Sequence, residues 1–412
     1  MSRQHQTEPS VALEAELSRL LDEPIELPAR LLQPTQETPS SLSSAQRAAL
    51  EHVSAYAKSR AAEARVVQDE VRRMCDVSEE DLRDALSKVR CDARVVVHFH
   101  PDRPISGGET VAAALLRDDC YRSQFETRIS NGGLTAHAGG QRDSIESQLF
   151  AGAYHVPGTL AGERPKYGSL DLLGHAEGAS PRFGSCYLVL KSHVSRRCTF
   201  SYLDSHEQPA ERGTLAEFDD ILAALLRESF LRDFALGERD FDPPALIRRL
   251  RTWLPMPVGS PATPFVHRNL NHYIEAQIHG DVLVSRDVAA LVADPSFEST
   301  EVGVALAALC ERRCIPLFWH CGFRLAATEV PADFRGPTMP SLARRVAKGG
   351  YIDAFLIGEA VRDLFANPTG WLDRGTYSQA LQELKLLWHV LVKHGRPTSP
   401  EGQLRASRSL AT

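Results

Sequence analysis

The 412-residue sequence lacks any run that would direct it to a membrane or to the general secretion route. No stretch approaches the roughly 20 apolar residues of a membrane-spanning helix. The first residues, Met1 to Ser10, are polar and lack the basic start and apolar centre of a secretory signal. We therefore expect no membrane association and a cytoplasmic location, unless a non-classical route exports the protein as an effector or toxin.

The sequence also lacks an excess of positive charge, because its formal net charge is −6. Without an overall basic field, a nucleic-acid partner is not expected. The eight cysteines are scattered, and several lie in apolar runs, as reduced thiols do in a reducing cytoplasm. Cys310 and Cys314, followed by His320 and Cys321, match no common zinc-site spacing, so no metal is expected.

The chain divides by composition into five segments. The first is rich in Ser, Thr, Gln, Pro and Glu and is expected to be a loosely ordered arm. A helical cap follows, since Ser43 and Ser78 each open a capping pattern before an apolar periodic run. After the main domain, helices are expected over Ser341–Phe365 and Tyr377–His394, and a polar tail ends the chain. The expected boundaries are 1–42, 43–90, 91–340, 341–395 and 396–412.

The main domain begins where the hydrophobic period changes at Arg94. Arg94 to His100 is a compact β-branched run that Pro101 ends, so we expect a strand. A helical insertion at about 207–270 separates the last strand-like run from the earlier ones. These strand-like runs cover residues 166–173, 185–191, 198–203 and 273–283. This irregular order predicts an α+β fold with a mixed sheet rather than a regular doubly wound parallel fold.

One acid, Glu275, lies inside an apolar run that should form a buried strand. A carboxylate on a core strand costs several kcal/mol unless it is paired or faces a wet cleft. An edge strand with Glu275 in solvent is one explanation, because alternating strands carry polar residues outward. We favour the other explanation, that Glu275 is a catalytic acid.

His98 and His100 alternate with Phe99, so both imidazoles are expected on one side of a strand. Such a pair begins the metal site of many amidohydrolase-type barrels, and it could equally contact a ribose or a pyrophosphate. Two histidines satisfied by neighbouring carbonyl groups are a third possibility. The eight alternating strand and helix units of a barrel are missing, which leaves a metal-dependent hydrolase as the alternative function.

A glycine-rich segment, Asn131 to Ala136, contains Gly132 and Gly133. Paired glycines let backbone amides approach an anion such as a dinucleotide phosphate, although they also form ordinary turns. The sequence has neither GxGxxG nor GxxxxGK[ST], so the two commonest phosphate-binding motifs are absent.

Three short segments carry a family resemblance when they are taken together. They are His98-Phe-His-Pro-Asp-Arg103, Arg164-Pro-Lys-Tyr-Gly168 and Glu275-Ala-Gln-Ile-His-Gly280. The chain resembles, over about residues 90–340, a bacterial family of domains of unknown function that is grouped with mono-ADP-ribosyltransferases. The resemblance implies an ADP-ribosyltransferase-like split mixed β-sheet with helical additions at both ends.

The resemblance implies that NAD is the substrate and that Glu275 is the catalytic residue. Cleavage of the nicotinamide bond passes through an oxocarbenium-like ribose, which a carboxylate stabilises. The family's active site also has a His or Arg on the first strand, and in this chain that position falls on His98, His100 or Arg103. A later strand carries a hydroxyl residue at the site, and here that position falls on Ser169. The product is ADP-ribose on a macromolecular acceptor, expected to be a protein.

Further cofactor contacts follow from the same resemblance. The amides of Gly132 and Gly133 would meet the phosphates, and Tyr154 or Tyr167 would stack on the nicotinamide ring. The chain differs from the arginine-modifying members of the superfamily at one position. Two residues before the catalytic glutamate those members carry an acid or Gln, whereas this chain has Tyr273. Gln277 is placed in the NAD site, and if it held the catalytic position instead, the protein would be a degenerate NAD-binding module.

Overall fold

A computed structural model describes residues 42–129, 134–254, 258, 269–399 and 404–407 of the chain. These residues belong to one compact unit, 41–412. The arm expected at 1–42 lies outside the described residues except for its last position, as do Gly132 and Gly133.

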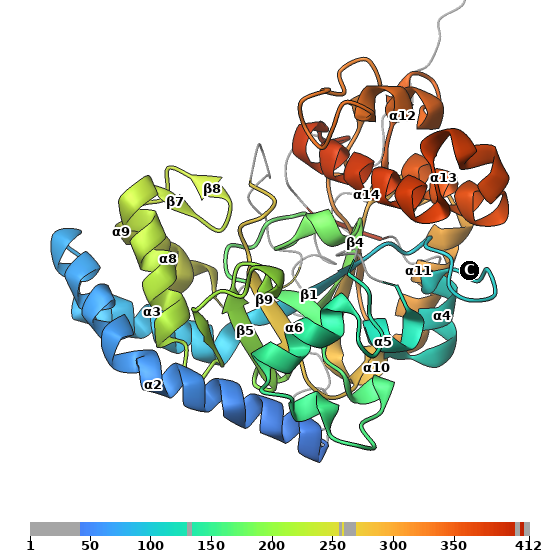
Figure 1. Cartoon of the computed structure of the whole chain (residues 1–412). Coiled ribbons are helices and arrows are strands. Elements are labelled where there is room, and N and C mark those ends of the chain that lie inside the picture. The colour runs from blue at the N-terminus through green and yellow to red at the C-terminus, as the bar shows by residue number, and fades with distance from the viewer. Residues whose placement is uncertain (1–41, 130–133, 255–257, 259–268, 400–403, 408–412) are drawn as a thin grey trace, which may run out of the picture. The chain divides into compact units, whose positions relative to one another are not determined.

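Nine of the described strands form one mixed sheet in the order β15-β12-β11-β4-β1-β3-β9-β5-β6 (Figure 1). Neighbouring strands are antiparallel except for the parallel pair β11 and β12. Their bounds are β1 Arg94–Phe99, β3 Lys166–Asp171, β4 Cys186–Leu190, β5 Cys198–Tyr202, β6 Arg212–Gly213, β9 Ile274–Ile278, β11 Val288–Ala293, β12 Leu317–Trp319 and β15 Arg405–Ala406. The predicted α+β class with a mixed sheet is confirmed.

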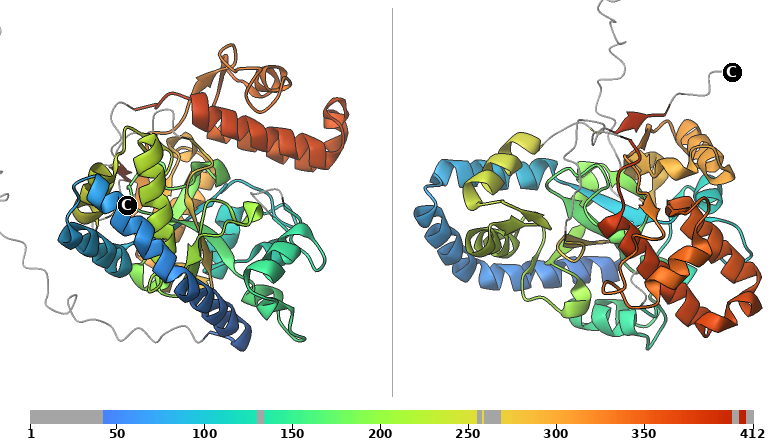
Figure 2. Two further views of the ribbon diagram at one scale, coloured as in Figure 1. Left: turned by 60° about the vertical axis from the view of Figure 1, so that its left-hand side comes forward. Right: turned by 90° about the horizontal axis from the view of Figure 1, so that it is seen from above.

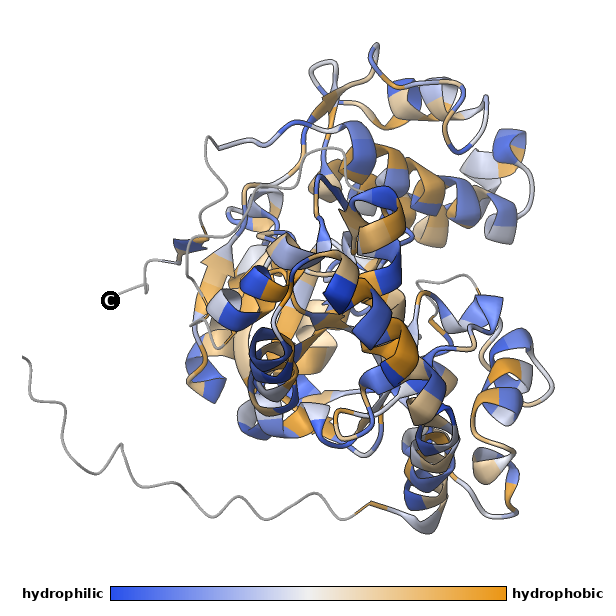
Figure 3. Cartoon of the chain, turned by 90° about the vertical axis from the view of Figure 1, so that its left-hand side faces the viewer, coloured by the Kyte–Doolittle hydropathy of each residue, from blue (hydrophilic) through white to orange (hydrophobic). Residues whose placement is uncertain are grey.

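The two faces of the sheet differ in chemistry because side chains alternate along each strand. On β1, Val95, Val97 and Phe99 join the main hydrophobic core, which also takes in residues of α4 (Val111–Asp118), α8 (Asp219–Arg232), α9 (Pro243–Trp253) and α11 (Glu301–Arg313). Val96 belongs to a separate apolar cluster on the other face. Figure 3 shows hydrophobic residues gathered in the sheet and in the helices that pack around it.

The N-terminal cap consists of α2 (Ser44–Met74) and α3 (Glu79–Asp92). Both expected caps are present, since the side chain of Ser43 accepts from the Gln46 amide and that of Ser78 accepts from the Asp81 amide. Helix α2 lies alongside α8 (Figure 2), and an ion pair of 2.6 Å joins Arg60 to Asp220.

The C-terminal helices are α12 (Met339–Val346), α13 (Ala354–Ala366) and α14 (Tyr377–His394). The single helix expected over Ser341–Phe365 is wrong, because Gly349 and Gly350 take positive φ angles of 59° and 82° and form a turn into the short strand β14 (Tyr351–Ile352). The polar tail contains β15, which pairs with β12 at the edge of the sheet. None of the helices in the described part is long and apolar enough to span a membrane.

Candidate functional site

Glu275 is buried near the middle of β9, with only 4% of its surface exposed. Strand β9 lies between β3 and β5, and its register places Glu275 opposite Ser169 on one side and Ser201 on the other. The carboxyl group lines a small pocket of about 50 Å³ together with Arg142, Tyr167, Asp204, Tyr273 and His98. Because β9 is an interior strand, the edge-strand explanation is wrong, and the Glu275 carboxyl group lines a pocket instead of facing solvent.

Burial and several neighbouring groups set the pKa of Glu275. Burial raises its pKa, and the nearby carboxyl group of Asp204 raises it further. The guanidinium of Arg142 and a hydrogen bond from Gln277 oppose this shift without cancelling it. The Glu275 pKa therefore stays above the ordinary value of 4.5, which is common for carboxyl groups at functional sites.

A buried chain of hydrogen bonds runs along the sheet and ends on Glu275. The Gln277 amide donates from Nε2 to Glu275 Oε1 over 3.0 Å, and its Oε1 accepts from Thr199 Oγ1 at 2.8 Å. Thr199 in turn contacts Nε2 of His279 at 3.1 Å, and Nδ1 of His279 is 2.5 Å from the hydroxyl of Tyr154. Gln277 thus holds the acid rather than lining the pocket, and Tyr154, with 1% exposure, lies at the far end of the chain.

Helix α6 (Gln141–Leu149) supplies the opposite wall of the pocket. The guanidinium of Arg142 lies over the ring of Tyr167, 4.1 Å from its centroid. The Tyr167 hydroxyl donates to Glu146 Oε1 at 2.7 Å, and Arg164 donates to Glu146 Oε2 at 2.8 Å. Burial raises the Glu146 pKa to about 7 against these two hydrogen bonds. Glu146 therefore holds Tyr167 in place at the pocket, with the guanidinium of Arg142 over its ring.

Both ring nitrogens of His98 are occupied by the backbone. Its Nδ1 donates to the carbonyl of Gly184 at 3.2 Å, and its Nε2 accepts from the amide of Ser180 at 3.3 Å. The ring is consequently neutral with its proton on Nδ1, and it lines the Glu275 pocket with no nitrogen left for a metal or a ribose. Among the three possibilities for this residue, the geometry favours a satisfied structural histidine. Ser169, fully buried, is likewise engaged, with its hydroxyl 2.8 Å from that of Ser180.

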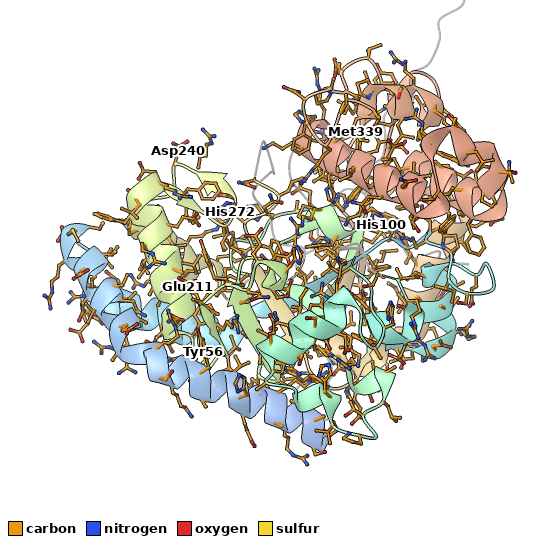
Figure 4. All side chains as sticks on the ribbon, in the orientation of Figure 1. Tyr56, His100, Glu211, Asp240, His272 and Met339 are labelled. Carbon is orange, nitrogen blue, oxygen red and sulfur yellow. The ribbon has the colours of Figure 1, made fainter. Side chains whose placement is uncertain are left out.

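His100 and Arg103 lie at a second pocket of about 190 Å³. Strand β1 ends at Phe99, so strand alternation does not place His100 beside His98. The His100 ring meets Trp388 edge-on at 5.3 Å, and Figure 4 places it between the sheet and the C-terminal helices. Burial and the charge of Arg103 lower its pKa to about 3, so the ring is neutral at neutral pH.

The two pockets share a wall that Tyr121 and Gln124 form. The described residues contain no group of three or more His, Cys, Asp or Glu side chains placed to hold a metal ion. Cys310 is buried in α11, whereas Cys314 is exposed at its end.

Sequence reasoning missed Arg142 and Asp204, and it took Glu146 for a helix residue near the glycine-rich segment, outside the site. Arg142 and Glu146 belong to a short helix whose charged residues look like an ordinary solvated face in the sequence. Both are in fact buried, at 4% and 0% exposure. Asp204 lies two residues beyond the end of β5. Its position near the end of a predicted strand was the one signal that the sequence offered.

The fold and site define an α+β protein with a buried carboxyl group at a pocket in the middle of a mixed sheet. Residues 94–394 match the model of a family described as protein of unknown function (DUF3626), and the chain belongs to that family. No curated protein matches the chain. The family description assigns no activity, so function has to be argued from the site.

Proposed function

We propose that this protein is a mono-ADP-ribosyltransferase, which transfers ADP-ribose from NAD to a protein acceptor and releases nicotinamide. The observation that carries the proposal is the position of Glu275. It is a buried acid on an interior strand, held by Gln277, beside the aromatic ring of Tyr167 and the cation of Arg142. The family resemblance of the three sequence segments adds to it.

The chemistry assigns a task to each of these groups. The bond between C1′ of the ribose and the nicotinamide nitrogen breaks, and its electron pair leaves with nicotinamide. The ionised Glu275 stabilises the positive charge that develops on the ribose. A nucleophile of the acceptor then bonds to C1′ and loses its proton. Tyr167 provides a face for the nicotinamide ring, and Arg142 favours the ionised form of Glu275.

NAD needs both pockets. Ligand pockets usually measure on the order of 300–1,000 Å³, and the Glu275 pocket alone is only about 50 Å³. The neighbouring pocket of about 190 Å³ adjoins it at Tyr121 and Gln124 and is lined by apolar side chains such as Ile105 and Leu115. We assign the nicotinamide end to the first pocket and the adenosine end to the second, with side-chain movement at their shared wall.

The first test is whether the purified protein binds and cleaves NAD. Calorimetry in a buffer with a chelator should show NAD binding, because the proposed site uses side chains alone. Chromatography should then show release of free nicotinamide, and adenylate-labelled NAD with a cell lysate should label protein. Binding without nicotinamide release would point instead to a degenerate NAD-binding module. The absence of both would remove the proposal.

A further inference from the structure

Cationic side chains from separate segments meet where α14 packs against the short helix η4 (Pro181–Phe183). The contact is anchored by Trp388, whose indole nitrogen donates to the carbonyl oxygen of Pro181 at 2.9 Å. Arg182 follows Pro181 directly. Lys385 lies almost one helical turn before Trp388, and His389 lies one turn after Lys385 on the same side of α14.

Two more cations reach the same place from elsewhere in the chain. Arg103 follows β1 and neighbours His100, whose ring contacts Trp388. Arg335 precedes α12 next to Phe334, whose ring packs against His394 of α14 at 5.2 Å. The charges of Arg182, Arg103 and Arg335 all act on Lys385, and together with burial they lower its pKa to about 8.

Only one of these cations has a carboxylate partner. Arg182 pairs with Asp204 at 2.6 Å. Within the described residues, the side chains of Arg103, Arg335 and Lys385 make no hydrogen bond and no ion pair, although all three are half-buried. Buried Nε atoms of Arg182 and Arg335 have no partner there either. Like charges held together in a partly dry place cost free energy unless an anion joins them.

His389 is a second, independent sign of a missing ligand. Its side chain is 5% exposed, and neither of its ring nitrogens has a hydrogen-bond partner in the described structure. Buried polar groups are nearly always satisfied, so an imidazole with both nitrogens open indicates an absent partner. The groups that face it are Arg335, Lys385, Arg182 and His100.

We infer that Arg103, Arg182, Arg335 and Lys385, with His389, form a binding site for a diphosphate group. The four cations outnumber the nearby carboxyl groups, Asp204 beside Arg182 and the buried Asp102 near Arg103, and this excess of positive charge suits a diphosphate better than a single carboxylate or a chloride ion. Guanidinium groups also match phosphate oxygens in geometry. The C-terminal helices thereby become part of the ligand site, because α14 carries Lys385 and His389.

The site adjoins both pockets, since Arg103 lines the pocket of about 190 Å³ and Asp204, the partner of Arg182, lines the Glu275 pocket. Arg335 also lines a further pocket of about 620 Å³. A dinucleotide with one half in each pocket would place its diphosphate here. That placement rests on the proposed function, whereas the anion site itself does not.

Binding of inorganic pyrophosphate tests the inference without NAD chemistry. Calorimetry on the full chain should show pyrophosphate binding, with ADP binding more tightly because its adenosine adds contacts. Lys385→Met should weaken pyrophosphate binding by about tenfold or more, as expected for loss of a charged hydrogen bond. The matched control is Lys348→Met, which changes an exposed lysine between α12 and β14 and should bind as the parent does.

Thermal unfolding separates a ligand site from a structural role. Without ligand, Lys385→Met should melt at or above the parental temperature, because it removes an uncompensated charge, and pyrophosphate should no longer raise its melting temperature. Arg335→Gln provides a second variant with the same expectation.

The inference is overturned if the parent does not bind pyrophosphate, or if both variants bind it as tightly as the parent. Charge-dependent pyrophosphate binding without NAD cleavage would keep the anion site and remove the transferase. If the protein cleaves NAD but both variants bind pyrophosphate as the parent does, the transferase proposal stands and the anion site is removed.

Discussion

Gln277 and Glu275 lie two residues apart on β9, and the amide nitrogen of Gln277 donates to Oε1 of Glu275 at 3.0 Å. The two-residue period of a strand puts both side chains on the same face. Because the amide oxygen of Gln277 accepts a hydrogen bond from Thr199, the amide cannot turn away, and it holds the Glu275 carboxyl group in one orientation. The same hydrogen bond favours the ionised form of Glu275.

Replacement of Gln277 by Leu should therefore impair the chemical step more than substrate binding. We expect kcat for nicotinamide release to fall by about tenfold or more while KM changes by less than about twofold. The Glu275 pKa should rise further, which would move the rising limb of the pH–rate profile to higher pH. Tyr154→Phe, at the far end of the hydrogen-bonded chain, should have a smaller effect in the same direction. A uniform loss of NAD affinity with normal kcat would show that Gln277 contacts NAD instead.

His98 on β1 and His100 just beyond its end should behave differently when each is changed to Ala. His98→Ala removes two buried hydrogen bonds to the backbone and should lower the free energy of unfolding by about 1–3 kcal/mol, with little direct effect on NAD affinity. His100→Ala should leave stability closer to that of the parent and weaken NAD binding by about 1–3 kcal/mol. Urea unfolding and calorimetry measure the two effects. Equal NAD affinity in the parent and in both variants would remove the first strand from the binding site.

The stability of the protein should depend on pH through Asp102, which faces Gly358 of α13 and is 2% exposed. Burial raises its pKa from 3.8 to about 7, the charges of Arg362 and Arg103 oppose this, and Asp294 adds to it. The folded protein keeps this proton up to about pH 7, whereas the unfolded chain releases it near pH 3.8. The unfolded state thus binds fewer protons in this window, and stability falls as pH rises through it, by at most about 1.4 kcal/mol per pH unit.

Urea unfolding at pH 5 and at pH 8 measures this dependence. Asp102→Asn keeps the shape but cannot ionise, so its stability should change less between the two pH values than that of the parent. Other buried carboxyl groups, such as Glu146, contribute in both proteins and cancel in the comparison. The same pH dependence in parent and variant would show that Asp102 is ionised in the folded protein.

Local patterns in the sequence predicted much of the fold. The caps at Ser43 and Ser78, the β-branched run at the start of β1 and the buried acid strand all depend on neighbouring residues, and all are found. The break between α12 and α13 was missed because the apolar period continues across Gly349 and Gly350, although their positive φ angles form a turn. The return of β15 to the sheet edge depends on a partner strand far away in the chain.

The candidate site, like the fold, could be predicted from the sequence only in part. Glu275 could be singled out because an acid is unusual on a core strand, whereas Tyr167 was suggested only by the family resemblance. The roles of His98, Tyr154 and Gln277 could not, since each depends on which distant atom satisfies its polar groups. The cations of the diphosphate site come from four separate segments, and only folding brings them together.

Glu275→Gln gives the most direct test of the central claim. The substitution keeps the shape of the side chain and removes its charge, so NAD affinity and the unfolding midpoint should stay close to those of the parent. Single-turnover release of nicotinamide should slow by about a hundredfold or more, the usual effect of losing a preorganised charge at the transition state. Glu311→Gln, the same change at an exposed position on α11, should cleave NAD at the parental rate. A Glu275→Gln protein that releases nicotinamide as fast as the parent would contradict the assignment of Glu275 as the catalytic acid.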